Sequence, residues 1–248
     1  MTALVRAELL KQRSTRTSLG LFVALLGLVL LAVLLHGFGL AAESLDGTDE
    51  QLMVLGRGEF LAALFGGLLG ALSITSEIRH GTIRPTFLIS PGRHRVVAAK
   101  VWVSILIGAG LGLAASALAV AVGVAALRAR GIEVQLDGGD YALLLAGSTV
   151  AAALWAAIGV GVGAIVRNQV PALIGLSAWL LFVEGLLAGD QGSFGDVGRF
   201  LPGAAAMAIS GQEPGRLLAP AAGLVLLALY AGAAVLGGAL ATDRRDVP

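Results

Sequence analysis

The sequence predicts an all-α, polytopic membrane protein with six transmembrane helices. Its composition is the first indication: 57% of the 248 residues are hydrophobic and 13% are charged, whereas soluble domains carry about 25% charged residues. The apolar residues also gather in long runs, and a helix needs about 20 of them to cross the hydrocarbon of a bilayer. The runs lack the alternation of barrel strands, which leaves helices as the way to satisfy the backbone in lipid.

The apolar runs divide the chain into spans and loops. They cover residues 19–40, 60–76, 97–127, 141–166, 170–187 and 217–241. The transmembrane domain is therefore expected over residues 19–241, after an N-terminal segment (1–18) and before a C-terminal tail (242–248). The first run follows several cations, as in a signal peptide, but it exceeds the 7 to 15 apolar residues of such peptides. We interpret it as a span.

The loop charges predict the orientation. With six spans both termini lie on one side, and that side collects most of the lysine and arginine residues, which makes it cytoplasmic by the positive-inside rule. Most of the acidic residues fall in the loops of the other side. We expect a multi-pass protein of the plasma membrane with both termini in the cytoplasm, and the excess of alanine, glycine and leucine suggests a bacterial source.

A polar, basic segment at residues 77–100 interrupts the apolar pattern between the second and third spans. Its one carboxylate, Glu77, faces several cations: Arg79, Arg84, Arg93, Arg95 and Lys100. Such a segment must lie in water or against a partner. Gly81 and Pro85 break the preceding helix, and Pro91 with Gly92 makes a turn. A short helix on the membrane surface is predicted, although the cations could serve lipid phosphates alone.

The segment before the first span mixes leucines with charges. Arg6, Glu8, Lys11 and Arg13 are its principal charged residues. An interfacial helix lying on an anionic leaflet is one interpretation. A plain charged topology anchor is the other.

Three pairs of glycines lie four residues apart within the spans. They are Gly66 with Gly70, Gly108 with Gly112, and Gly159 with Gly163. This spacing lets helix backbones approach closely in lipid. It fits packing within the chain or a dimer interface.

The last outer loop, residues 189–216, contains a semi-apolar stretch that is too short to cross a bilayer. A short helix in the outer leaflet or over the bundle is expected there, with a surface loop as the alternative. Glu184, near the outer end of the fifth span, is the ionisable residue that comes closest to the bilayer interior. It is a candidate for a pathway or gating role, or a structural partner of a loop cation.

Several kinds of chemistry are excluded. The chain has no cysteine and three histidines, which cannot form a zinc or thiol site. Neither lysine follows the glycine-rich pattern of a phosphate loop, since Gln12 and Val101 come after them. The chain is therefore not expected to be an enzyme, to bind a cofactor or to bind nucleic acid.

The run from Glu77 to Arg84, EIRHGTIR, followed by Leu88-Ile89-Ser90-Pro91, Arg93 and Ala99-Lys100, resembles the hallmark of ABC-2 type permeases. These are membrane subunits of ATP-binding-cassette exporters. The charged opening with Glu8 and Lys11, the six spans and the Leu201-Pro202 segment agree with the resemblance. The chain lacks a fused ATPase and a large outer domain, which implies a separately encoded ATPase.

The resemblance implies a mechanism and its partners. A coupling helix would dock on an ABC ATPase subunit, present in two copies and carrying the ATP and magnesium, and a second permease copy or a homologue would complete the pathway. The implied docking and exit residues are Glu77, Arg79, His80, Gly81, Thr82, Arg84, Pro91, Arg93 and Lys100. The cargo would be a hydrophobic or amphipathic drug, lipid or peptide. The alternatives are a non-transporting accessory or immunity protein and a small secondary carrier.

Overall fold

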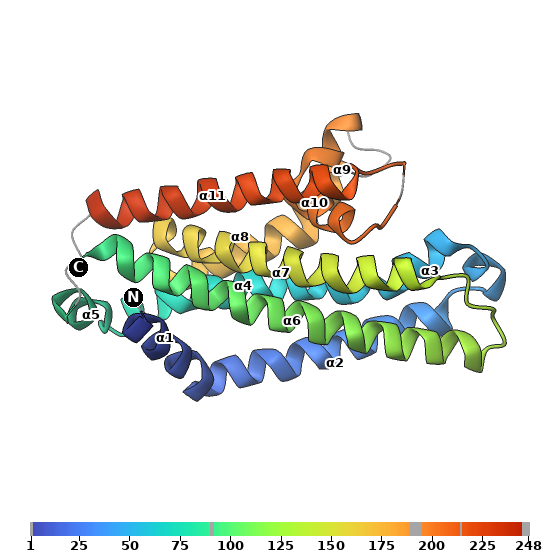
Figure 1. The fold of residues 1–248 in the computed structure, drawn as a ribbon, viewed down its shortest axis with the longest axis horizontal. Coiled ribbons are helices and arrows are strands. Elements are labelled where there is room, and N and C mark those ends of the chain that lie inside the picture. The colour runs from blue at the N-terminus through green and yellow to red at the C-terminus, as the bar shows by residue number, and fades with distance from the viewer. Residues whose placement is uncertain (1, 90–91, 189–194, 214, 245–248) are drawn as a thin grey trace.

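The computed structural model describes residues 2–89, 92–188, 195–213 and 215–244, which fold into an elongated bundle of helices (Figure 1). Within those residues there is no β-strand. The elements in chain order are α1 (Thr2–Ser14), α2 (Arg16–Gly39), η1 (Ala42–Leu45), α3 (Thr48–Leu55), α4 (Arg57–Arg79), α5 (Ile83–Ile89), α6 (Arg93–Ala129), α7 (Gly138–Val166), α8 (Gln169–Ala178), the π-helix η2 (Trp179–Val183), α9 (Glu184–Ala188), η3 (Gly195–Phe200), α10 (Pro202–Ile209) and α11 (Pro220–Arg244).

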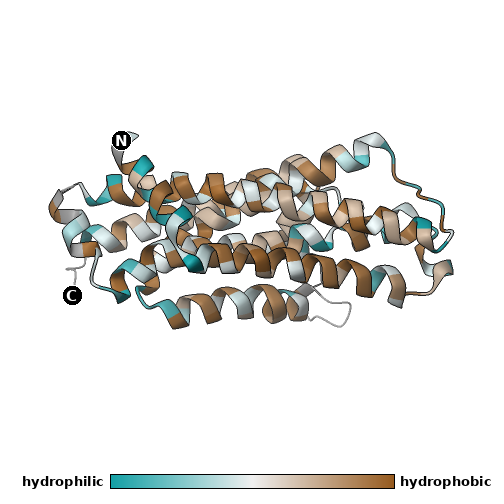
Figure 2. Ribbon diagram, turned by 90° about the horizontal axis from the view of Figure 1, so that it is seen from below, coloured by the Kyte–Doolittle hydropathy of each residue, from teal (hydrophilic) through white to brown (hydrophobic). Residues whose placement is uncertain are grey.

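Six helical segments are long and apolar enough to cross a membrane, in agreement with the six spans that the sequence predicts. They are Arg16–Gly39, Thr48–Arg79, Arg93–Ala129, Gly138–Val166, Gln169–Leu187 and Pro220–Arg244. Hydrophobic residues run along the middle of the bundle, and hydrophilic residues gather toward its ends (Figure 2). The start of α1, α5 and the end of α11 lie at the same end of the bundle (Figure 1), which we call the terminus end.

Helices α4 and α7 form the centre of the bundle. In their most apolar stretches 72% and 67% of the residues are buried, against 17% in α2 and 17% in α11. Much of the apolar surface of α2 and α11 is therefore exposed, as expected of helices that face hydrocarbon. The core itself is made largely of alanine, leucine and valine side chains.

Small residues make this centre possible. A methyl group on Gly70 would overlap the backbone oxygen of Ala156, and one on Gly159 would overlap that of Gly67. The same holds for Gly66, Gly108, Gly112 and Gly163, each of which faces backbone atoms of a neighbouring helix. The glycine spacing thus serves packing within the chain, and that interpretation of the sequence is confirmed. Because backbones meet directly, α4 and α7 gain van der Waals contact along their length.

The end of α4 is a glycine-terminated helix stop. The amide of Thr82 donates to the carbonyl of Glu77 (3.0 Å), and the amide of Gly81 donates to that of Ile78 (3.2 Å). Gly81 has φ +69°, the left-handed conformation that glycine adopts without strain. This turn reverses the chain into α5, whose residue Leu88 is 84% exposed.

Helix α3 lies toward the opposite end of the bundle, and α10 lies beside the start of α11 (Figure 1). Helix α10 begins with Pro202, the favoured first residue of a helix, and buries its alanines against the bundle. The short helix expected in the outer loop is therefore present. Residues 189–194 and 214 of that loop lie outside the described residues.

Candidate functional site

Four charged side chains from three helices form one ion-pair cluster at the terminus end. Lys100 Nζ of α6 lies 2.8 Å from Glu8 Oε2 of α1 and 2.8 Å from Glu77 Oε1 of α4. Lys11 Nζ of α1 lies 2.9 Å from Glu8 Oε1 and 2.8 Å from Glu77 Oε1. We call these four residues the charge cluster. It fastens α1 to the two helices that flank the predicted coupling segment.

Helix geometry explains how the sequence brings these groups together. Glu8 and Lys11 are three residues apart on α1, so they share one face of that helix. Lys100 lies within the first turns of α6 and also donates to the backbone carbonyl of Ser73 on α4 (2.9 Å). Lys100 is 1% exposed, and burial of its charge is tolerated because it has three acceptors for its three donors.

The cluster alters the protonation of its α1 members. Burial favours the neutral form of the Glu8 carboxyl, but the ammonium groups of Lys100 and Lys11 outweigh burial, and the pKa of Glu8 lies below its ordinary value. Burial likewise favours neutral Lys11, yet its hydrogen bonds with Glu77 and Glu8 raise the pKa of Lys11 above the ordinary value. The Glu8 carboxylate and the Lys11 ammonium are therefore both charged at neutral pH and attract each other.

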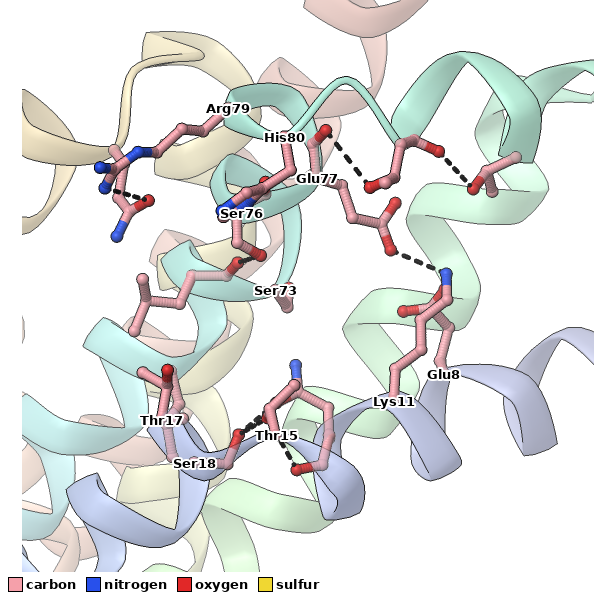
Figure 3. Close-up of a pocket in the computed structure, with 16 residues that line it drawn as sticks. Glu8, Lys11, Thr15, Thr17, Ser18, Ser73, Ser76, Glu77, Arg79 and His80 are labelled. Atoms are coloured by element: carbon pink, nitrogen blue, oxygen red, sulfur yellow. Dashed lines mark hydrogen bonds and ion pairs between the residues drawn. The ribbon is translucent and has the colours of Figure 1, made fainter.

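A cavity of about 650 Å³ opens beside the charge cluster (Figure 3). It lies among the ends of α1 and α4, the start of α2 and the α5 segment. The lining comprises Glu8, Lys11, Gln12, Thr15, Thr17, Ser18, Leu69, Leu72, Ser73, Ser76, Glu77, Arg79, His80, Thr82, Thr86 and Gln169. Most of these residues have polar or charged side chains and two are leucines on α4, but the atoms that face the cavity are mainly carbon.

Arg79 and His80 line this cavity and are exposed; Arg79 is the last residue of α4, and His80 follows it. Arg79 donates to the side-chain oxygen of Gln169 at 3.4 Å, a long bond to a neutral partner. The His80 ring bonds the carbonyl of Ser76 at 2.7 Å. Among the described residues, Arg79 has no carboxylate partner, so its charge remains available to a ligand.

The structure divides the predicted docking residues into two groups. Arg79, His80, Gly81 and Thr82 are exposed at the turn between α4 and α5. Glu77 and Lys100 are buried in the charge cluster and face the interior of this chain. They are therefore placed to support the segment from within.

The remaining predicted residues are placed as follows. Arg84 lies in α5. Arg93 begins α6 and donates to the carbonyl of Thr242 at 3.1 Å. Arg6 and Arg13 are exposed on α1. Pro91 lies outside the described residues.

Glu184 lies at the other end of the bundle and has no cation as its partner among the described residues. One of its oxygens accepts from the indole Nε1 of Trp179, and both accept from the amide of Gly203 (3.0 and 2.8 Å) near the start of α10. A carboxylate is stabilised at a helix N-terminus by unpaired amides and the helix dipole. The contacts join the π-helix region to α10.

Sequence reasoning missed a second buried carboxylate near that end. Glu59 is 1% exposed, although its place just before an apolar run assigns it to an outer loop. Gln212 Nε2 donates to one of its oxygens at 3.2 Å, and the other oxygen has no hydrogen-bond partner. Glu59 and Glu184 are therefore two buried carboxylates in this part of the bundle, where the sequence drew attention to Glu184 alone. The signal that could have found it is its position directly beside the apolar run, because extending the predicted helix by one residue toward the N-terminus includes Glu59.

No group of three or more His, Cys, Asp or Glu side chains within the described residues could hold a metal ion. No family model matches the chain, and no curated protein matches it.

Proposed function

We propose that the chain is the membrane subunit of an ATP-driven exporter of the ABC-2 type, which moves a hydrophobic or amphipathic substrate using a separate ATPase. The observation that carries the proposal is the charge cluster directly beneath the exposed α4–α5 turn. It links α1, α4 and α6 by ion pairs of 2.8–2.9 Å, at the segment whose sequence resembles a coupling helix.

The geometry supports mechanical coupling. Helix α5 follows α4 through the turn at Gly81 and contacts α6. A partner pressing on α5 would therefore displace α4 and α6 together, because the charge cluster resists their separation. Helix α4 packs along α7 through the glycine contacts, so the displacement would reach the centre of the bundle. Packed helices transmit strain because their interiors have low compressibility.

The proposal includes an orientation and partners. The terminus end faces the cytoplasm of a bacterial cell, because most of the lysine and arginine residues lie there. Two ATPase subunits bind at this face. A second copy of the chain, or a homologue, completes the pathway.

Co-purification tests the proposal. The chain would be co-expressed with an ABC ATPase encoded beside it, and recovery of the complex and substrate-stimulated ATP hydrolysis would be measured. Reversing Arg79 and Arg84 together, each to Glu, is expected to abolish both. The matched control reverses Arg128 and Arg199, two exposed cations outside the docking segment, and is expected to leave both unchanged. Retained ATPase binding in the first variant would refute docking at this segment.

One observation favours a secondary carrier as a second candidate. Glu59 is a buried carboxylate with an oxygen that lacks a partner, and buried ionisable groups in spans often serve proton or ion relays. Transport that needs a proton gradient and no ATPase, and that is lost in Glu59→Gln, would support this candidate over the exporter.

A further inference from the structure

We infer that the cavity beside the charge cluster binds the headgroup of an anionic phospholipid from the adjoining leaflet. The inference concerns this chain alone and holds whether or not an ATPase is its partner. It rests on the charge of the lining, the polarity along its length and its depth in the membrane.

The charges around the cavity leave one cation in surplus. Glu8 and Glu77 are matched by Lys11 and Lys100 through the ion pairs of the cluster. Arg79 is then the unmatched charge, with the neutral Gln169 side chain as its described hydrogen-bond partner. A guanidinium presents several donors in a fixed fork, which suits the oxygens of a phosphate.

Hydroxyl groups surround the same space. They belong to Thr15, Thr17, Ser18, Ser73, Ser76, Thr82 and Thr86. Six of them already take part in hydrogen bonds within the chain, namely Thr15, Ser18, Ser73, Ser76, Thr82 and Thr86. Their oxygens can still accept from the glycerol hydroxyls of a headgroup, and the Thr17 hydroxyl can also donate to a phosphate oxygen. Figure 3 shows Thr15, Thr17 and Ser18 across the space from Ser76 and Arg79.

The far end of the cavity is apolar. Its lining on α4 extends from Arg79 back to Leu69, about 15 Å along a helix that rises about 1.5 Å per residue. A small free anion would use the polar end and leave Leu69 and Leu72 against water. A phospholipid would place its phosphate at Arg79 and the start of its acyl chains against the leucines.

The depth of the cavity matches a leaflet boundary. Thr15, Thr17 and Ser18 line it where the span of α2 begins, and Arg79 ends the span of α4. The ends of the α2 and α4 spans therefore both lie beside the cavity, at the level where the hydrocarbon of a leaflet gives way to its headgroups. Its volume of about 650 Å³ falls in the ordinary range of ligand pockets, about 300 to 1,000 Å³.

The absence of cysteine allows a direct test. The chain contains no cysteine, so Thr17→Cys introduces a single thiol into the cavity wall. The full-length variant, reconstituted in nanodiscs, would be treated with a water-soluble maleimide, and the rate of labelling would be measured. Nanodiscs of phosphatidylglycerol in phosphatidylcholine would be compared with pure phosphatidylcholine, with and without inorganic phosphate.

Phosphatidylglycerol is expected to slow labelling, and inorganic phosphate is not. Adding Arg79→Gln should weaken this protection about fivefold, the usual contribution of one cation near an anionic surface. The matched control, Arg13→Gln, removes an exposed cation of α1 that does not line the cavity and should change protection less than about twofold.

Three results would overturn the inference. Equal labelling in both lipids would show that the cavity does not select anionic headgroups. Equal protection by inorganic phosphate would show that a free anion suffices. Oxidative cross-linking of two chains through the introduced thiol, if it blocks labelling in either lipid, would show that a second copy of the chain occupies the space.

Discussion

The ammonium of Lys100 and the carboxylate of Glu8 lie 2.8 Å apart, although 92 residues separate them in the chain. The pair is buried and joins the N-terminal helix to the third span. Its burial has a consequence for stability, because an ion that loses its partner in a low-dielectric site retains the cost of desolvation.

Removal of Lys100 should therefore be costly. We expect Lys100→Met to lower the free energy of unfolding by about 3–5 kcal/mol, because Glu8 and Glu77 would then share Lys11 alone. Lys11→Met should cost less, since the Lys11 side chain is 46% exposed and water can replace it. Denaturation in detergent, followed by tryptophan fluorescence, measures both. A Lys100→Met variant as stable as the parent would contradict the assignment.

The α4–α7 contact should be sensitive to single methyl groups. Gly70→Ala and Gly159→Ala each introduce a carbon into backbone atoms of the facing helix, and overpacking of this kind costs about 1–3 kcal/mol. Gly110→Ala is the control, because nothing lies within 4 Å of the added carbon. Thermal stability measured by size-exclusion chromatography after heating should fall for the first two variants alone. Equal stability of all three would mean that the two helices do not meet backbone to backbone.

Attachment of α1 should persist over a wide pH range. The pKa of Glu8 is lowered, so its contribution is complete above the ordinary carboxyl pKa of about 4.3 and is lost as the pH falls through the folded-state value. The pKa of Lys11 is raised, so its contribution is complete below about 10.4 and is lost as the pH rises through its folded-state value. Spin labels at Leu10→Cys and Arg95→Cys, both exposed, would report the distance between α1 and α6. That distance should stay constant from about pH 5 to pH 9, and release of α1 near pH 6 would disprove the role of the cluster.

Glu184 should hold α10 in place. Glu184→Ala removes the acceptor of the Trp179 indole and the Gly203 amide, and the loss of such buried hydrogen bonds costs about 1–3 kcal/mol. Faster proteolysis between α9 and α11 is the expected result. Glu213→Ala, a change in the same loop at a residue paired with exposed Arg216, should have little effect. Proteolysis unchanged by Glu184→Ala, with transport abolished, would instead favour a pathway role.

Prediction from sequence succeeded where the signal was local. Each span was found because hydropathy over about 20 residues depends on neighbouring residues alone, and the helix stop at Gly81 was visible as turn chemistry. The charged residues of the 77–100 segment were all found, but as one surface. Separating the buried residues of this segment from the exposed ones requires knowing which helix face contacts a neighbouring helix. The hydropathy of a polar segment does not give that information.

The sequence by itself determined the membrane class, the six helices and the polar segment between the second and third spans, because lipid forces long apolar runs into helices that satisfy their own backbone. The tertiary structure decided which polar groups are paired. Glu8 meets Lys100, Glu59 is buried beside Gln212, and Glu184 binds the start of α10. These pairs join residues far apart in the chain. Their energy depends on desolvation and on the distances between helices, and neither can be predicted from a local sequence pattern.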